Sequence, residues 1–359
     1  MNQNPDGLEH ATGRGQFFAL DSRHWFEVLC LENITVACAY LVMARGTHAD
    51  NRFSSWSAEA VRKYLGVGIR KALIAKDRLI TAGLIRRDGG TVTHPRYDLR
   101  PHNYEDDETS LIWLPNAIID GVDSETPPVK LLRQGQDLGA LRLFVALYDA
   151  TDLPEHGGIP RALLRQKHEA VRVGQRGPFS VWGFEIGSNM SATFDSPLVA
   201  PFKTGKLVTG PDGKKRDAGW MYFWDALGVI TSSGLLEFVP HVLEADTEEA
   251  EILFPHPVAD SGHACEREIG DVAQEAGEAC LTEGQLEGVR CNGLSLFPLP
   301  SHIVRPAVIS IARLRYRPRT KATGAWFAQT QQRAEYWIPR FRAITEAISN
   351  NRSLRRLVA

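Results

Sequence analysis

Gly66 separates two stretches of helical periodicity, and the sharp turn it allows between them is the feature that most restricts how this chain folds. The first stretch begins at Ser57, a favoured N-cap residue, and its inward positions are Ala60, Val61, Tyr64 and Leu65. The second stretch runs from about Ile69 to Ala82, and its inward positions are Ala72, Ala75, Leu79 and Ala82. Val67 can fill the angle between the two predicted helices.

Further elements are predicted on both sides of this helix pair. An apolar run, FFALD, ends in Asp21, which can cap a short helix, and a second helix from Ile34 ends at Gly46. After the pair, GLIRR changes to the period of a strand, and Asp88-Gly89-Gly90 is a hairpin turn signal before a returning strand, TVTHPRYDL. Three helices followed by a basic hairpin are the elements of a winged helix-turn-helix.

The stretch SSWSAEAVRKYLGVGIRKALIAKDRLITAGLIRRDGG resembles the winged helix-turn-helix superfamily, in particular its members in replication and regulatory proteins of bacterial plasmids and phages. Its ending, AGLIRR, is the most specific part. The preceding AYLVMARGTHADNRFSSW is similar to uncharacterised bacterial proteins of mobile elements. The resemblance covers less than a third of the chain, and it implies DNA binding without indicating the biological process.

Charge is distributed along the chain in blocks of alternating sign, although the total is only -2. Residues 52–100 hold eleven Lys/Arg against four carboxylates, residues 244–290 hold thirteen carboxylates against two arginines, and residues 305–356 hold twelve Lys/Arg against two glutamates. The basic blocks can meet phosphates, whereas the acidic block is expected to be a mobile connector because it is rich in Gly and Ala and poor in aromatics. Three solvated faces without a partner are the alternative.

The residues expected to contact DNA lie on the helix pair and in the hairpin wing. They are Ser57, Arg62, Lys63, Arg70, Lys71, Ile74, Arg78, Arg86 and Arg87. Arg70 and Lys71 fall in the first turn of the second helix, which points at base edges when such a helix enters the major groove. Arg86 and Arg87 are expected along the DNA backbone beside the wing. A protein–protein module would not require this density of cations.

A second winged-helix-like domain is predicted over residues 106–256. Its expected helices follow Asn116 and Pro128, span GALRLFVALYDATDL and IPRALLRQKHEAVRVG, and end with GWMYFWDALGVITSSG before a strand of the second wing. A loop-rich insertion is expected at about 173–216, with TGPDGKKRD as a basic hairpin or loop tip. Trp220, Tyr222, Phe223 and Trp224 are expected in the core and not as a base-stacking platform.

The remaining segments are a tail, a linker and a basic C-terminal block. Residues 1–16 are predicted to be a disordered tail before a domain over 17–105, and residues 257–295 to be an acidic linker. Residues 296–359 should form a strand and then a helix from about Gly324 to Ile348, kinked or interrupted at Pro339. The cations here are expected either to contact DNA phosphates or to dock onto the acidic stretch: Arg313, Arg315, Arg317, Arg319 and Lys321.

Motifs of catalysis are not found in the sequence. GxxxxGK[ST], HExxH and GxSxG are absent, and the histidines do not form the paired pattern of rolling-circle initiators. Five cysteines without a close pair argue against disulfides and a zinc site. The expectation is a protein without enzymatic activity, cofactor or metal. No signal peptide is recognised, and the longest apolar run is far below the roughly 20 residues that span a bilayer, which favours the bacterial cytoplasm.

Together these patterns predict an α+β protein with tandem winged-helix domains, each a three-helix bundle with a β-hairpin wing. Its predicted function is sequence-specific binding of double-stranded DNA, as a replication initiator-like protein of a plasmid or phage without its own catalytic activity. A transcriptional repressor of a mobile element and a winged-helix protein–protein adaptor are the alternatives. The expected partners are double-stranded DNA, a second copy of the chain and host replication proteins, with no membrane association.

Overall fold

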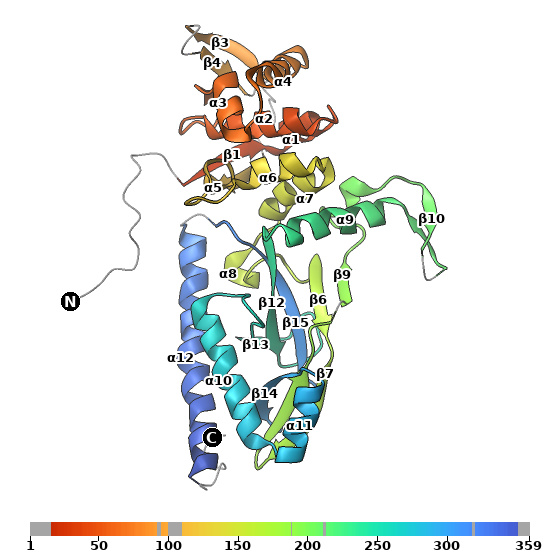
Figure 1. Cartoon of the computed structure of the whole chain (residues 1–359), viewed down its shortest axis with the longest axis vertical. Helices are drawn as coiled ribbons and strands as arrows, with labels where there is room; N and C mark the ends of the chain where they lie inside the picture. Colours follow the sequence, from red (N-terminus) through yellow and green to blue (C-terminus); the bar gives the residue numbers. More distant parts are fainter. Residues whose placement is uncertain are drawn as a thin grey trace, which may run out of the picture. The chain divides into compact units, whose positions relative to one another are not determined.

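The structure, a computed structural model, describes residues 16–91, 95–99, 110–187, 189–210, 213–317 and 320–350. They form two compact units, shown in Figure 1. The N-terminal unit runs to Asp149 and includes residues 225–227 and 316–318, and the C-terminal unit comprises the rest. Both units combine helices with antiparallel strands, so the predicted α+β class is confirmed. The sequence predicts a boundary after residue 105, whereas the N-terminal unit continues to Asp149.

The N-terminal unit begins with a strand that feeds directly into a capped helix. β1 (Phe17–Asp21) pairs antiparallel with β5 (Leu111–Pro115), and α1 (Ser22–Leu29) follows β1. The Asp21 carboxylate accepts hydrogen bonds from the backbone N–H groups of Arg23 at 3.0 Å and His24 at 3.3 Å. The predicted cap is therefore confirmed, because these N–H groups have no partner within the helix.

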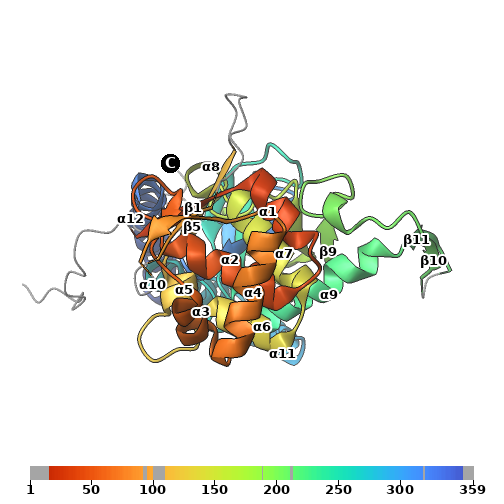
Figure 2. The same ribbon diagram turned by 90° about the horizontal axis from the view of Figure 1, so that it is seen from above.

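The segment around Gly66 forms three helices and a small sheet within this unit. α2 (Ile34–Arg45), α3 (Ala58–Leu65) and α4 (Ile69–Thr81) pack against one another, as Figure 2 shows. α2 is buried from Val36 to Ala44 and forms the centre of the group. β2 (Phe53–Ser54), β4 (Pro95–Asp98) and β3 (Arg86–Gly90) form one antiparallel sheet in the order β2-β4-β3. The helices predicted at these positions are confirmed.

The hairpin differs from its prediction in one respect. The sequence predicts the turn at Asp88, Gly89 and Gly90, but these residues lie within β3, where the pairing with β4 shifts between Arg87 and Gly89. Gly89 has φ of 124° and Gly90 has φ of 76°, and positive φ is typical of glycine at a strand irregularity. The two glycines therefore produce a bulge, and the connection follows them.

Three further helices complete the N-terminal unit. They are α5 (Ala117–Asp120), α6 (Pro128–Gly135) and α7 (Leu138–Asp149). Pro128 occupies the first position of α6, where its missing N–H is tolerated. Asn116 precedes α5 as expected, but its side chain makes no cap hydrogen bond.

The C-terminal unit is built on two antiparallel sheets. The larger has the order β13-β12-β15-β6-β9. Its strands are β6 (Leu164–His168), β9 (Asn189–Ala192), β12 (Leu236–Leu243), β13 (Ile252–Pro255) and β15 (Ala307–Leu314). The smaller sheet has the order β14-β8-β7, with β7 (Ala170–Arg176), β8 (Phe179–Phe184) and β14 (Ser295–Pro300). Every residue of β15 is buried, so this strand lies in the interior of the unit.

A hairpin and six helical segments accompany these sheets. β10 (Leu207–Thr209) and β11 (Lys215–Asp217) form the basic hairpin that the sequence predicts at 209–217. The helical segments are α8 (Leu153–His156), η1 (Ala200–Phe202), α9 (Gly219–Ser232), α10 (Ala264–Cys280), α11 (Glu283–Cys291) and α12 (Lys321–Ser349). α10 and α12 lie side by side (Figure 1). The long C-terminal helix is confirmed, and it continues through Pro339.

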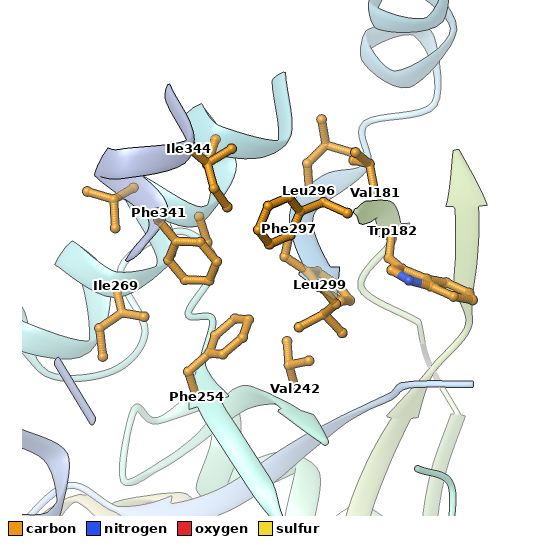
Figure 3. Packing of buried hydrophobic residues seen from close by; sticks show 14 of the residues in the cluster. Val181, Trp182, Val242, Phe254, Ile269, Leu296, Phe297, Leu299, Phe341 and Ile344 are labelled. Carbon is orange, nitrogen blue, oxygen red and sulfur yellow. The ribbon is translucent and has the colours of Figure 1, made fainter. Parts of the chain in front are cut away.

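The main core of the C-terminal unit is a cluster of aromatic and aliphatic side chains from both sheets and both long helices, shown in Figure 3. Phe254 of β13 contacts Phe341 of α12 edge to face, with ring centres 5.2 Å apart. α10 contributes Ile269, Val272, Ala273, Ala276 and Cys280 to this cluster. The predicted mobile acidic linker is therefore wrong for 264–291: the acidic residues belong to helices whose apolar face is buried.

The prediction of a second winged helix is also wrong, both for its strands and for one of its helices. Residues 159–174, expected to be helical, contain β6 and most of β7. Their residues favour helices in isolation, but pairing with β15 and β8 determines the conformation. β12, expected in a second wing, lies between β13 and β15 in the larger sheet. The segment expected to be a loop-rich insertion contains β8, β9 and the β10–β11 hairpin.

Candidate nucleic-acid interface

The turn between α3 and α4 has the geometry that its glycine predicts. Gly66 has φ of 62°, in the left-handed region, and its N–H donates to the Arg62 carbonyl at 3.0 Å. Val67 is 8% exposed and packs at the turn. Ser57, predicted to contact DNA, caps α3 by accepting a hydrogen bond from the Glu59 N–H at 3.3 Å. The turn thus fixes where α4 begins relative to α3.

α4 separates a narrow buried face from a broad exposed one. Ala72, Ala75 and Leu79 are buried, as the spacing predicts, whereas Ala82, also predicted to face inward, is exposed at the end of the helix. Arg70 and Lys71 are exposed in the first turn of the helix. Gly68, at the N-cap position, has no side chain with which to cap the first N–H groups of α4. Because these N–H groups and the helix dipole favour anions, the beginning of α4 combines two cationic side chains with an anion-binding backbone.

The other cations of the helix pair make weak local contacts. Arg62 pairs with Glu59, with Nε 2.8 Å from the carboxylate, which raises the pKa of Arg62 and lowers that of Glu59. The Lys63 ammonium lies 5.1 Å from the ring centre of Tyr64, and Arg78 donates to the Leu31 carbonyl at 3.5 Å. Exposed ion pairs contribute little to stability, so Arg62 can exchange Glu59 for a phosphate at small cost.

The β3–β4 hairpin, predicted to be a wing, is organised by a buried carboxylate that the sequence interpretation missed. Asp98 is fully buried and accepts hydrogen bonds from Arg52 at 3.0 and 2.9 Å and from Arg86 at 3.3 Å. Its hydrogen bond with Arg52 raises the pKa of that arginine. The signal for this role is that Asp98 is the single acidic residue of the predicted strand TVTHPRYDL. Arg86, still 60% exposed along its side chain, is thus oriented by Asp98.

Two further arginines of the wing also have defined positions. Arg87 donates to the carbonyl of Thr91, the residue after β3, at 3.4 Å. Arg96 lies 4.0 Å from the ring centre of Phe53 and 3.4 Å from the Asp88 carboxylate. Together with Arg86, these side chains give the wing an exposed cationic surface.

α4 also exposes apolar side chains between its cations. Ile69, Leu73, Ile74 and Ile80 are 45%, 42%, 52% and 37% exposed. In the major groove such side chains contact the methyl groups of thymine, as expected for Ile74. A row of exposed apolar residues on one helix is equally typical of a surface that binds a protein.

The cations predicted near the C-terminus do not form one surface. Arg313 is buried, and its Nη1 lies 2.8 and 2.7 Å from the two carboxylate oxygens of Glu266. The prediction that Arg313 contacts DNA is therefore wrong, because β15 places it inside the unit. Arg315 and Lys321 are exposed, Arg317 is half-buried, and Arg319 lies outside the described residues.

The alternative, docking of basic residues onto the chain's own acidic stretch, is observed in the C-terminal unit for Arg313 among the predicted residues. Besides the Arg313–Glu266 pair, Arg342 of α12 donates to Glu268 of α10 at 2.9 Å. The acidic and basic blocks are thus partly neutralised by each other, through the packing of α10 against α12 and through the Arg313–Glu266 pair between β15 and α10.

A buried serine–histidine pair in the larger sheet has the wrong tautomer for nucleophile activation. His168 Nε2 lies 2.7 Å from Ser310 Oγ, and His168 Nδ1 accepts a hydrogen bond from the Gly187 N–H at 3.0 Å. Nε2 therefore carries the proton and donates it towards Ser310, whereas a general base would accept. Burial lowers the pKa of His168 to about 4, so the ring is neutral. The pair is structural.

One group of side chains has ligand atoms close enough for a metal ion in the part of the chain that the structure describes. Asp152, Glu155 and His156, at α8, place their ligand atoms within 4.8 Å of one another. The Asp152 carboxylate already accepts a hydrogen bond from the Glu155 N–H at 3.1 Å, as the N-cap of this short helix. The group is explained by capping.

Comparison of the chain with protein-family models, with characterised proteins and with solved structures gives no match. Among the described residues, no helix has the length and apolar character required to cross a membrane.

Proposed function

We propose that residues 34–98 form a winged helix-turn-helix that binds double-stranded DNA. The element order α2-β2-α3-α4-β3-β4 and the single sheet β2-β4-β3 support this assignment. The observation that carries the proposal is the exposure of Arg70 and Lys71 in the first turn of α4, beside helix N–H groups without a capping side chain. In this mode Arg70, Lys71 and Ile74 face base edges in the major groove, while Arg86 and Arg87 lie along the backbone.

Within this proposal the protein is a replication initiator-like protein of a plasmid or phage, which marks repeated sites and leaves the chemistry to host enzymes. The resemblance of residues 54–90 to such proteins supports this role. A repressor of a mobile element would use the same surface. A transformation assay separates the two, because only an initiator allows its gene and flanking repeats to maintain a plasmid that lacks another origin.

The binding proposal is tested by titrating the Arg70→Ala/Lys71→Ala variant against the DNA upstream of the gene in a gel shift. Removing each side chain that binds a base edge should cost about 1–3 kcal/mol, so the affinity of this double variant should fall by at least tenfold. The slope of log affinity against log salt concentration should decrease by about 1 for each phosphate that the variant no longer neutralises. Arg172→Ala/Arg290→Ala, two exposed cations of β7 and α11, is the matched control and should bind as the wild type does.

The proposal fails if the Arg70→Ala/Lys71→Ala variant, shown to be folded by circular dichroism, retains both the wild-type affinity and the wild-type salt slope. It fails equally if the wild type does not bind duplex DNA, whether the upstream sequence or an unrelated one.

A second candidate function is a protein–protein adaptor, favoured by the exposed Ile69, Leu73, Ile74 and Ile80 of α4. An adaptor should retain its partner from nuclease-treated lysate, and Leu73→Ser/Ile80→Ser should lose that partner. A DNA-binding role predicts instead that this variant loses little affinity for DNA, since both cations of the first turn remain.

A further inference from the structure

The C-terminal unit contains a cavity of about 770 Å³ between α12, the end of β14 and the segment that follows β14. Ligand sites for small molecules typically have volumes of about 300–1,000 Å³ and mostly apolar walls with a few polar groups. Neither the proposed DNA surface nor the sequence interpretation accounts for this cavity, because all its lining residues belong to the C-terminal unit.

The walls of the cavity are apolar and held in place by the core behind them. Lining side chains include Phe179, Leu253, Pro300, Ile303, Phe341 and Ile344. Figure 3 shows Phe341 and Ile344 on α12, on the same side of the core as Ile269. The Trp337 indole N–H donates to the Leu253 carbonyl at 2.8 Å, which ties α12 to β13 at the wall. A wall fixed in this way is already formed before a ligand enters.

Polar groups of the cavity are concentrated in a few side chains. Two arginines, Arg305 and Arg340, line it beside His302, with a single carboxylate, Glu244. The Arg340 guanidinium lies 3.4 Å from the ring centre of Tyr336 and donates to the Tyr336 carbonyl at 2.8 Å, so its position is defined. The Arg305 side chain makes no hydrogen bond or ion pair with any residue that the structure describes. These arginines can therefore receive an anionic group.

We propose that this cavity binds a small amphipathic carboxylate, with its hydrocarbon body against the apolar walls and its carboxylate at Arg305 and Arg340. Burial of hydrocarbon supplies most of the binding free energy, at about 25 cal/mol for each Å² removed from water. The two arginines provide charge-assisted hydrogen bonds that select the acid over a neutral molecule of the same shape. Because α12 encloses part of the cavity, the length of the ligand's hydrocarbon body is limited.

The test is isothermal titration of the full chain with decanoate and with decanol. Decanoate should bind, and Arg305→Gln/Arg340→Gln should weaken its binding at least tenfold while changing decanol binding less than threefold. Ala343→Phe places a ring in the cavity and should abolish binding of both molecules. Arg172→Gln/Arg290→Gln removes the same charge elsewhere and should bind decanoate as the wild type does.

Because Ala343→Phe can disturb α12, Ile303→Trp fills the cavity independently from the segment after β14 and should have the same effect. Titration with 1-naphthoate then shows whether the cavity prefers a ligand with an aromatic body or one with an aliphatic body. The proposal is overturned if the wild type binds no carboxylate, if the arginine variant binds decanoate and decanol as the wild type does, or if both cavity-filling variants bind normally. None of these results bears on DNA binding, since α4 is unchanged in every variant.

Discussion

Arg313 Nη1 lies 2.7 Å from a carboxylate oxygen of Glu266, and both side chains are 1% exposed. Burial favours the neutral acid, but the charge of Arg313 and the hydrogen bonds from Arg313 and from the His263 N–H together lower the pKa of Glu266. Burial and the same charge lower the pKa of His241 to about 3, so its neutral Nε2 accepts a hydrogen bond from Arg313 at 2.8 Å. The Arg313 guanidinium also lies 5.1 Å from the Trp326 ring centre. This arginine is thus surrounded by partners within one unit.

Removing one member of this ion pair should lower the free energy of unfolding more than removing both members. Arg313→Met leaves Glu266 as an unpaired buried charge and should lower the free energy of unfolding by about 3–5 kcal/mol. Arg313→Met/Glu266→Leu replaces both charges by apolar groups and should recover most of that loss. Chemical denaturation of the two variants measures the difference. Equal losses in both would show that the pair is not energetically coupled.

The neutral His168 should make the C-terminal unit sensitive to acid. The pKa of this ring is about 4 in the folded protein and 6.5 in the unfolded chain. Between these values the unfolded state binds a proton that the folded state excludes, so stability is complete above pH 6.5 and decreases as the pH falls towards 4. Between pH 7 and pH 5 His168 should account for a loss of about 2 kcal/mol.

Urea denaturation at pH 7 and pH 5 checks this effect in His168→Gln. The variant should be less stable at pH 7, but its further loss on acidification should be smaller than that of the wild type. His302→Gln, an exposed histidine, should retain the wild-type pH dependence. If His168→Gln loses as much stability on acidification as the wild type, His168 does not exclude the proton in the folded state.

Asp98 should be required for both the stability and the DNA affinity of the wing. Asp98→Asn weakens the bonds to Arg52 and Arg86 inside a buried site, which should cost about 1–3 kcal/mol of unfolding free energy. Because Arg86 then loses its orientation, binding of duplex DNA should weaken as well. Asp88→Asn removes the exposed pair with Arg96 and is the control with little expected effect on stability. Thermal unfolding and gel shifts on both variants compare the two sites.

The parts of the fold that the sequence predicts correctly are those determined by neighbouring residues. The Asp21 cap, the helix pair around Gly66 and the long α12 each depend on interactions within a few positions of the chain. The sequence of β6 wrongly predicts a helix because its residues favour helices locally, while its partner β15 lies more than a hundred positions away. No local pattern indicates such a pairing.

For the candidate DNA-binding residues too, the sequence predicts what depends on neighbouring residues and not what depends on distant ones. The exposure of Arg70 and Lys71 is predictable because the buried face of α4 leaves only one side for them. The burial of Arg313 is not, since it depends on Glu266, 47 positions away on a different element. When the charges are summed over each block of the sequence, the acidic block that contains α10 and the basic block that contains β15 indicate two independent charged surfaces. In the folded structure, part of each block is buried.

Gly66 should tolerate substitution less well than a glycine of ordinary helical conformation. At φ of 62° an alanine pays about 1–2 kcal/mol for the left-handed conformation. Its Cβ would lie 3.0 Å from Cε of Lys130, a flexible side chain that can move, so backbone strain and not a clash sets the cost. Gly288 of α11 has open space around its Cβ position, and Gly288→Ala should instead stabilise the protein by about 0.5–1 kcal/mol. Opposite shifts of the two variants in chemical denaturation are the expected result, and a Gly66→Ala variant as stable as the wild type would contradict the strained turn.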